Sequence, residues 1–132
     1  MKILLIGEYS RLHNSLKEGL QKNGHKVTLL GSGDGFKNYP VDIKIKRVTS
    51  TVANQVIFGG PARVLGFSAN CTAGAGTITI EDDGTSLGVF GTPNGATNPF
   101  VYSVMFPGTG LYCKTSATCS LGTIADVTFF YG

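Results

Sequence analysis

The chain has 132 residues, which fits one ordinary domain or one small domain with an additional supersecondary unit. A hydrophobic fraction of 42% is enough for a core and excludes a wholly disordered chain, whereas only 14% of the residues are charged. No stretch reaches the ~20 apolar residues of a membrane helix, and the apolar run in MKILLIGEYS is too short for a signal peptide. We therefore expect no membrane partner and no export.

Charge is divided unevenly along the chain. Residues 1–48 hold nine basic and four acidic residues, a net charge of +5, and residues 49–132 hold two basic and four acidic residues, a net charge of −2. The basic residues form no dense run with interleaved aromatic residues. This favours a solvated basic face over a nucleic-acid-binding surface, so we expect no nucleic-acid partner.

The first part of the chain has the pattern of a βαβ unit. KILLIG (2–7) is a short apolar run that predicts a buried strand, and VTLLG (27–31) predicts a second one. Between them we expect a helix from an N-cap at Ser10 to about Asn23, ended by Gly24. Its apolar stripe consists of Leu12, Leu16 and Leu20. The two strands should be parallel, and VDIKIKRV (41–48) alternates like an edge strand.

From Thr49 onward the helical period disappears. GTITIEDDGTSLGVF (76–90) alternates around a DDG turn and predicts a hairpin. Further short β runs are PARVLGFSAN, VYSVMF, GLYC and ADVTFFYG. Five to seven such strands predict a small β-sandwich or jelly-roll-like module over 49–132, preceded by the short βαβ segment of 1–48, so the fold class is mainly β. The boundary falls near residues 47–50.

Residues 1–46 resemble the N-terminal start of a GT-B type glycosyltransferase. The resemblance is carried by MKILLIGEYS, the leucine-striped helix and GHKVTLLGSGDGFKNYPVDI. It implies a Rossmann-like beginning. That family holds its nucleotide-sugar donor mainly in a second domain, for which this chain has no counterpart, so we do not expect a working sugar transferase.

Residues 49–132 resemble small virion structural proteins of tailed bacteriophages, of the capsid-decoration kind. GPARVLG, the threonine- and glycine-rich hairpin and the terminal VTFFYG carry the likeness. The resemblance implies a homo-oligomer on a lattice of the major capsid protein, located in virions that are assembled in the host cytoplasm.

The glycine-rich and histidine-containing segments are weak candidates for ligand sites. GEYS (7–10) could cradle an anion at a helix N-terminus, but a strand-to-helix turn needs a glycine in any case. GSGDGF (31–36) precedes no evident helix and so lacks the context of a dinucleotide fingerprint. His13 and His25 have no second ligand at metal spacing.

Three acidic residues lie together at Glu81, Asp82 and Asp83. Paired carboxylates can act in acid–base chemistry or bind Ca²⁺, but EDDG at a hairpin tip is more typical of a turn. We therefore expect no metal site and no catalytic residues.

The cysteines and aromatic residues complete the candidates. Cys113 and Cys119 are spaced so that a disulfide could close a hairpin loop, whereas buried reduced thiols, with Cys71 among them, are the default without export. The aromatic residues of the last strand, Phe129, Phe130 and Tyr131, suit either a core or a subunit interface.

Together these patterns predict a structural assembly protein, a phage capsid decoration or other virion component that self-associates, with no enzymatic activity and no cofactor. The alternative is a glycosyltransferase-related fragment that keeps nucleotide-sugar or acceptor binding.

Overall fold

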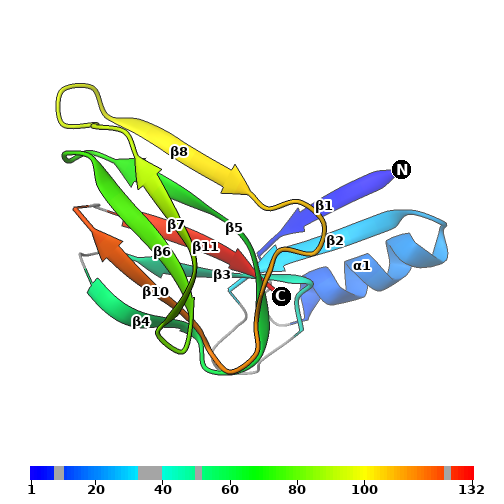
Figure 1. The fold of residues 1–132 in the computed structure, drawn as a ribbon. Helices are drawn as coiled ribbons and strands as arrows, with labels where there is room; N and C mark the ends of the chain where they lie inside the picture. Colours follow the sequence, from blue (N-terminus) through cyan, green and yellow to red (C-terminus); the bar gives the residue numbers. More distant parts are fainter. Residues whose placement is uncertain (8–10, 33–39, 50–51, 124–125) are drawn as a thin grey trace. The chain divides into compact units, whose positions relative to one another are not determined.

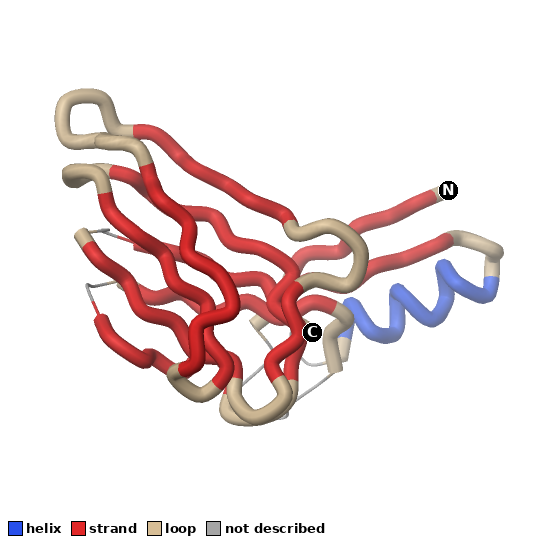
Figure 2. Tube along the Cα trace, viewed as in Figure 1, coloured by secondary structure: helices blue, strands red, loops and turns tan. Residues whose placement is uncertain are grey.

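The computed structural model describes residues 1–7, 11–32, 40–49, 52–123 and 126–132, and strands dominate it (Figures 1 and 2). The chain divides into two compact units, one formed by Met1–Ile45 with Gly132 and the other by Lys46–Tyr131. The predicted fold class, a small β-rich domain after a short segment with one helix, is confirmed.

The first unit is the predicted βαβ arrangement. It contains β1 (Lys2–Ile6), α1 (Leu12–Lys22), β2 (Lys26–Gly31) and the beginning of β3 (Ile43–Val48). β1 and β2 pair in parallel, and β2 also pairs in parallel with the beginning of β3. The short apolar runs therefore become neighbouring strands, as a βαβ connection requires. The prediction that β1 is buried is wrong, because none of its residues is buried and Leu4 and Ile6 are 56% and 69% exposed.

Helix α1 ends as predicted. The Gly24 N–H donates to the Gln21 carbonyl, and the His25 N–H donates to the Leu20 carbonyl, which is the hydrogen-bond pattern of a glycine-terminated helix. The helix begins at Leu12, with Arg11 at the N-cap position, and the predicted cap Ser10 lies outside the described residues.

We expected the apolar stripe of α1 to be buried, and this prediction is wrong. No residue of the helix is buried, and Leu12 and Leu16 are 67% and 47% exposed. Polar contacts orient the helix instead: Lys17 pairs with Asp42, and the Asn14 side chain donates to the Pro40 carbonyl. These contacts fix the helix by its polar side, so two of the three stripe leucines face solvent.

The second unit consists of two antiparallel sheets. Its strands are β4 (Val52–Phe58), β5 (Ala62–Cys71), β6 (Gly76–Asp82), β7 (Thr85–Thr92), β8 (Phe100–Met105), β9 (Leu111–Cys113), β10 (Ala117–Gly122) and β11 (Asp126–Tyr131). In one sheet the end of β3 is followed by β11, β5 and β8, with β9 also beside β5; the other has the order β4-β10-β6-β7. This is the predicted sandwich.

The predicted hairpin is confirmed, but two strands were missed. β6 and β7 pair around a tight turn at Asp83 and Gly84, both with positive φ (49° and 82°). β4 and β10 were not predicted. Their pairing contains two register shifts, and β10 reads ATCSLG, so neither strand shows a regular alternation of large apolar residues.

Phe67 is the centre of the core between the two sheets. Its side chain is fully buried, and its ring centroid lies 5.4 Å from Phe90, 5.9 Å from Tyr102 and 6.3 Å from Phe129. These aromatic residues come from both sheets, because Phe90 belongs to β7 and the others to β5, β8 and β11. Burial of the aromatic cluster therefore holds the sheets together.

The division between the units lies between Ile45 and Lys46, slightly before the predicted boundary at 48 and 49. β3 runs through this point. The strand order gives it β2 as one neighbour and β11 as the other, so the prediction of an edge strand for VDIKIKRV is wrong.

Replacing the central aromatic residue tests this core. We expect Phe67→Ala to lower the free energy of unfolding by about 3–5 kcal/mol, because it leaves a cavity among packed rings. Val89→Ala, on an exposed position of β7, should change it by less than about 0.5 kcal/mol. Urea unfolding followed by circular dichroism measures both free energies. If Phe67→Ala lowers the free energy of unfolding as little as Val89→Ala does, Phe67 is not the centre of the core.

Candidate functional site

The three acidic residues of the hairpin do not converge. Asp83 is at the turn itself, while Asp82 and Glu81 make separate hydrogen bonds with different segments. Among the described residues no group of three or more histidine, cysteine, aspartate or glutamate side chains is arranged to hold a metal ion. The turn interpretation of EDDG is confirmed.

Asp82 closes the loop before β10. Its carboxylate accepts hydrogen bonds from the backbone N–H groups of Lys114, Thr115 and Ser116, at 2.9, 2.9 and 3.1 Å. These hydrogen bonds lower the pKa of Asp82, and the bond from the Thr115 N–H contributes most. The side chain thus substitutes for backbone acceptors in the KTS turn.

Glu81 lies on the outer face of the second sheet and is nevertheless only 8% exposed. Its carboxylate accepts a hydrogen bond from Ser120 Oγ at 2.8 Å and a longer one from Thr118 at 3.5 Å. Ser120 Oγ in turn accepts from the Asn54 N–H at 3.0 Å. This network joins β4, β10 and β6, a structural use of a carboxylate that sequence reasoning did not predict.

A second polar contact links the two ends of the sandwich sequence. Arg47 Nε and Nη2 donate to the two carboxylate oxygens of Asp126 at 2.8 and 2.7 Å, and Asn70 donates to the same carboxylate at 3.0 Å. Chiefly through the Arg47 bond, the pKa of Asp126 is lowered. The partners are 79 residues apart in the chain, so no local pattern could have revealed the pair.

All three cysteines are free, buried thiols, and the Cys113–Cys119 disulfide is not formed in the structure. Burial, with the carboxylate of Glu81 nearby, raises the pKa of Cys119 to about 12, and burial also raises the pKa of Cys71 and Cys113. These thiols are therefore protonated core residues, the alternative that the sequence favoured.

The predicted interface aromatics are divided by the pleat of β11. Phe129 and Tyr131 point into the core, and Phe130, between them, is half-buried on the opposite face. Alternation along the strand thus assigns Phe129 and Tyr131 to the core and leaves only Phe130 for a partner.

The remaining predicted candidates are described only in part. His13 and His25 lie in the first unit, and the buried Nδ1 of His13 has no hydrogen-bond partner among the described residues. Most of GEYS and of GSGDGF lies outside the described residues, so the anion-cradle and loop interpretations stay predictions. No described helix is long and apolar enough to span a bilayer.

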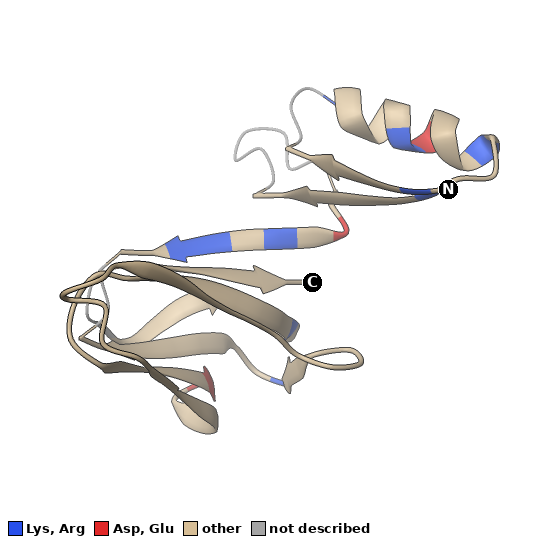
Figure 3. Cartoon of the chain, turned by 90° about the horizontal axis from the view of Figure 1, so that it is seen from above, with Lys and Arg blue, Asp and Glu red and all other residues tan. Residues whose placement is uncertain are grey.

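The exposed apolar residues of the second unit point to a different kind of site. β7 and β8 end their respective sheets and have one strand neighbour each among the described strands. Val89 in β7 and Val101 and Met105 in β8 are each 63% exposed. Neither strand contains a charged residue, and most of the lysine and arginine positions, blue in Figure 3, lie in the first unit and in β3. We call the residues Thr85–Thr92 and Phe100–Met105 the β7–β8 edge.

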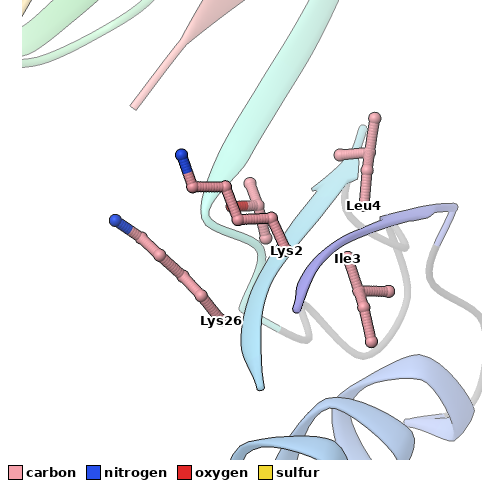
Figure 4. A pocket seen from close by; sticks show the side chains of 5 residues that line it. Lys2, Ile3, Leu4 and Lys26 are labelled. Carbon is pink, nitrogen blue, oxygen red and sulfur yellow. The ribbon is translucent and has the colours of Figure 1, made fainter.

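The first unit has a shallow hollow of about 340 Å³ on its strand surface (Figure 4). It is lined by Lys2, Ile3, Leu4, Lys26 and Thr28. The two lysines make one end of it cationic, while Leu4 beside them is exposed. The hollow belongs to β1 and β2 and does not include the glycine loops that the sequence singled out.

No protein-family model, curated protein or solved structure matches this chain.

The carboxylates give the stability of the second unit a predictable dependence on pH. The folded pKa of Asp82 is below its ordinary value of ~3.9, so its stabilisation is complete above that value and is lost as the pH falls through the folded pKa. We expect Asp82→Ala to be less stable than the wild type at pH 7 and to lose less stability on acidification to about pH 3. Urea unfolding at both pH values measures this.

Asp83→Asn is the matched control, because it removes a carboxylate from the same hairpin and keeps a residue that tolerates positive φ. If acidification lowers the free energy of unfolding of Asp82→Ala as much as that of the wild type, the hydrogen bonds to Asp82 do not contribute to the pH dependence of stability.

Proposed function

We propose that this chain is a structural assembly protein whose sandwich unit self-associates, of the kind that decorates the capsids of tailed bacteriophages. The observation that carries the proposal is the β7–β8 edge, where apolar side chains are exposed on uncharged strands at the ends of both sheets. Edge strands of monomeric proteins are usually protected by charges, prolines or bulges, since they can otherwise pair with another chain. An assembly protein uses such an edge instead of blocking it.

Two of the three segments behind the phage resemblance are neighbours in the fold. GPARVLG leads into and begins β5, and VTFFYG forms nearly all of β11. The two strands are antiparallel neighbours, with Phe129 opposite Phe67 and Tyr131 opposite Val64. These two segments therefore share one part of the core, while the third, the β6–β7 hairpin, belongs to the other sheet. The virion location and the capsid-lattice partner rest on this resemblance.

Self-association is tested by the mass of the intact chain in solution. Sedimentation velocity over a wide range of concentrations should show a species of at least twice the monomer mass, whose fraction rises with concentration. A chain that remains monomeric throughout the range would contradict the proposed function.

A second candidate function is binding of a nucleotide sugar by a glycosyltransferase-related fragment. It is favoured by the parallel pairing of β1 and β2 with α1 between them, and by the exposure of Leu4 and Ile6. Parallel sheets normally have both faces covered, so such exposure suits a piece of a larger α/β domain.

Isothermal titration of the intact chain with uridine diphosphate glucose tests this candidate. If the cationic hollow holds the diphosphate, binding should be measurable and should weaken in Lys26→Ala, whereas Lys22→Ala, on α1, should bind like the wild type. An absence of binding at high ligand concentration would exclude the candidate.

A further inference from the structure

The unpaired side of β8 is defined by its ladder with β5. The two strands pair without a register shift, from Gly66 opposite Met105 to Cys71 opposite Phe100. Just beyond the ladder, the Phe106 N–H donates to the Leu65 carbonyl at 2.9 Å. Because hydrogen-bonded pairs alternate in antiparallel sheets, Tyr102 and Val104 direct their backbone groups toward β5.

The alternate residues of β8 therefore direct their backbone N–H and C=O groups to the unpaired side. These are Val101, Ser103 and Met105. Their side chains are exposed on the outer face of the sheet, whereas Tyr102 and Val104 pack against the core. Backbone hydrogen-bonding groups and apolar surface are thus offered by the same three residues.

The other sheet ends of the second unit are less regular. β4 has two register shifts in its pairing with β10, and Asn54 within it has φ 50°, so its edge is irregular. The β6–β7 ladder contains one shift, between Ile80 and Glu81. Among these strands β8 is the regular one, and it contains no charge, proline or bulge to block pairing.

We propose that two copies of the chain associate through β8, by antiparallel pairing of the two β8 strands about a two-fold axis at Ser103. This inference rests on the proposed function and names the surface that performs it. In this register Ser103 lies opposite its counterpart, and Val101 lies opposite Met105 of the second copy. Each of these pairs can exchange both backbone hydrogen bonds, because all three residues face the unpaired side.

The composition of β8 favours a second copy of the chain as the partner that pairs with its free edge. An open ladder requires an extended strand, and the sequence FVYSVM has no charged residue with which an acidic or basic peptide could pair. Two identical strands bring no like charges together, and their exposed valine and methionine side chains meet across the axis. A two-fold contact of this kind uses the β8 edge of both copies, so it forms a dimer to which no third copy can be added through β8.

Cysteine substitution at the axis tests the register directly. In a hydrogen-bonded antiparallel pair the Cα atoms are ~5.5 Å apart, within the ~4.4–6.8 Å range of disulfides. We expect Ser103→Cys in the full chain to form a covalent dimer on mild oxidation, seen on a non-reducing gel and reversed by dithiothreitol. The native cysteines are buried, and Gln55→Cys, exposed on β4, is the matched control that should remain largely monomeric.

A charge at the same edge gives the second readout. We expect Val101→Lys to weaken the association measured by sedimentation about tenfold or more, because a lysine must be desolvated at the paired edge. Val56→Lys adds the same charge to an exposed valine of β4 and should associate like the wild type. Circular dichroism confirms that each variant is folded.

The outcomes separate this inference from the proposed function. If the wild type associates but Ser103→Cys forms no more covalent dimer than Gln55→Cys and Val101→Lys associates normally, the β8 interface is overturned and self-association stands. If the wild type is monomeric at every concentration, both are overturned. Preferential dimerisation of Ser103→Cys together with weakened association of Val101→Lys supports both.

Discussion

The burial of Phe67 between the two sheets is the interaction on which the second unit depends. With this ring inward, the pleat fixes the direction of every neighbour in register with it: Phe129 in β11 and Val104 in β8 also face the core. The residues between them must then face outward. The exposed positions of Val101, Ser103 and Met105 are therefore a consequence of the core, and the proposed function uses a surface that the packing itself creates.

The first unit has no comparable centre. Val27 and Leu29 are its described buried apolar residues, and α1 is fixed by polar contacts such as that of Lys17 with Asp42. The Leu29 N–H also donates to Asp42, at 2.7 Å, so a single carboxylate connects the helix to β2. A βαβ segment of this size buries little apolar surface of its own.

The sequence predicted what local patterns determine. The βαβ unit, the glycine that ends α1, the DDG hairpin and the mainly β fold all follow from periodicity and turn chemistry. It did not predict β4, β10 or the contacts of Glu81 and Arg47, because these depend on partners far along the chain. It also misplaced the leucine stripe, since a helical period gives the spacing of apolar residues but not which side the tertiary contacts select.

The sandwich has its own core, and we expect it to unfold as its own cooperative unit. Native-state hydrogen exchange on the intact chain, resolved by residue, tests this expectation most directly. The account predicts that the backbone amides of β5 and β11 exchange with one large common free energy of opening, and those of β1 and β2 with a distinctly smaller one. A single common free energy for all four strands would contradict it, because both units would then share one core.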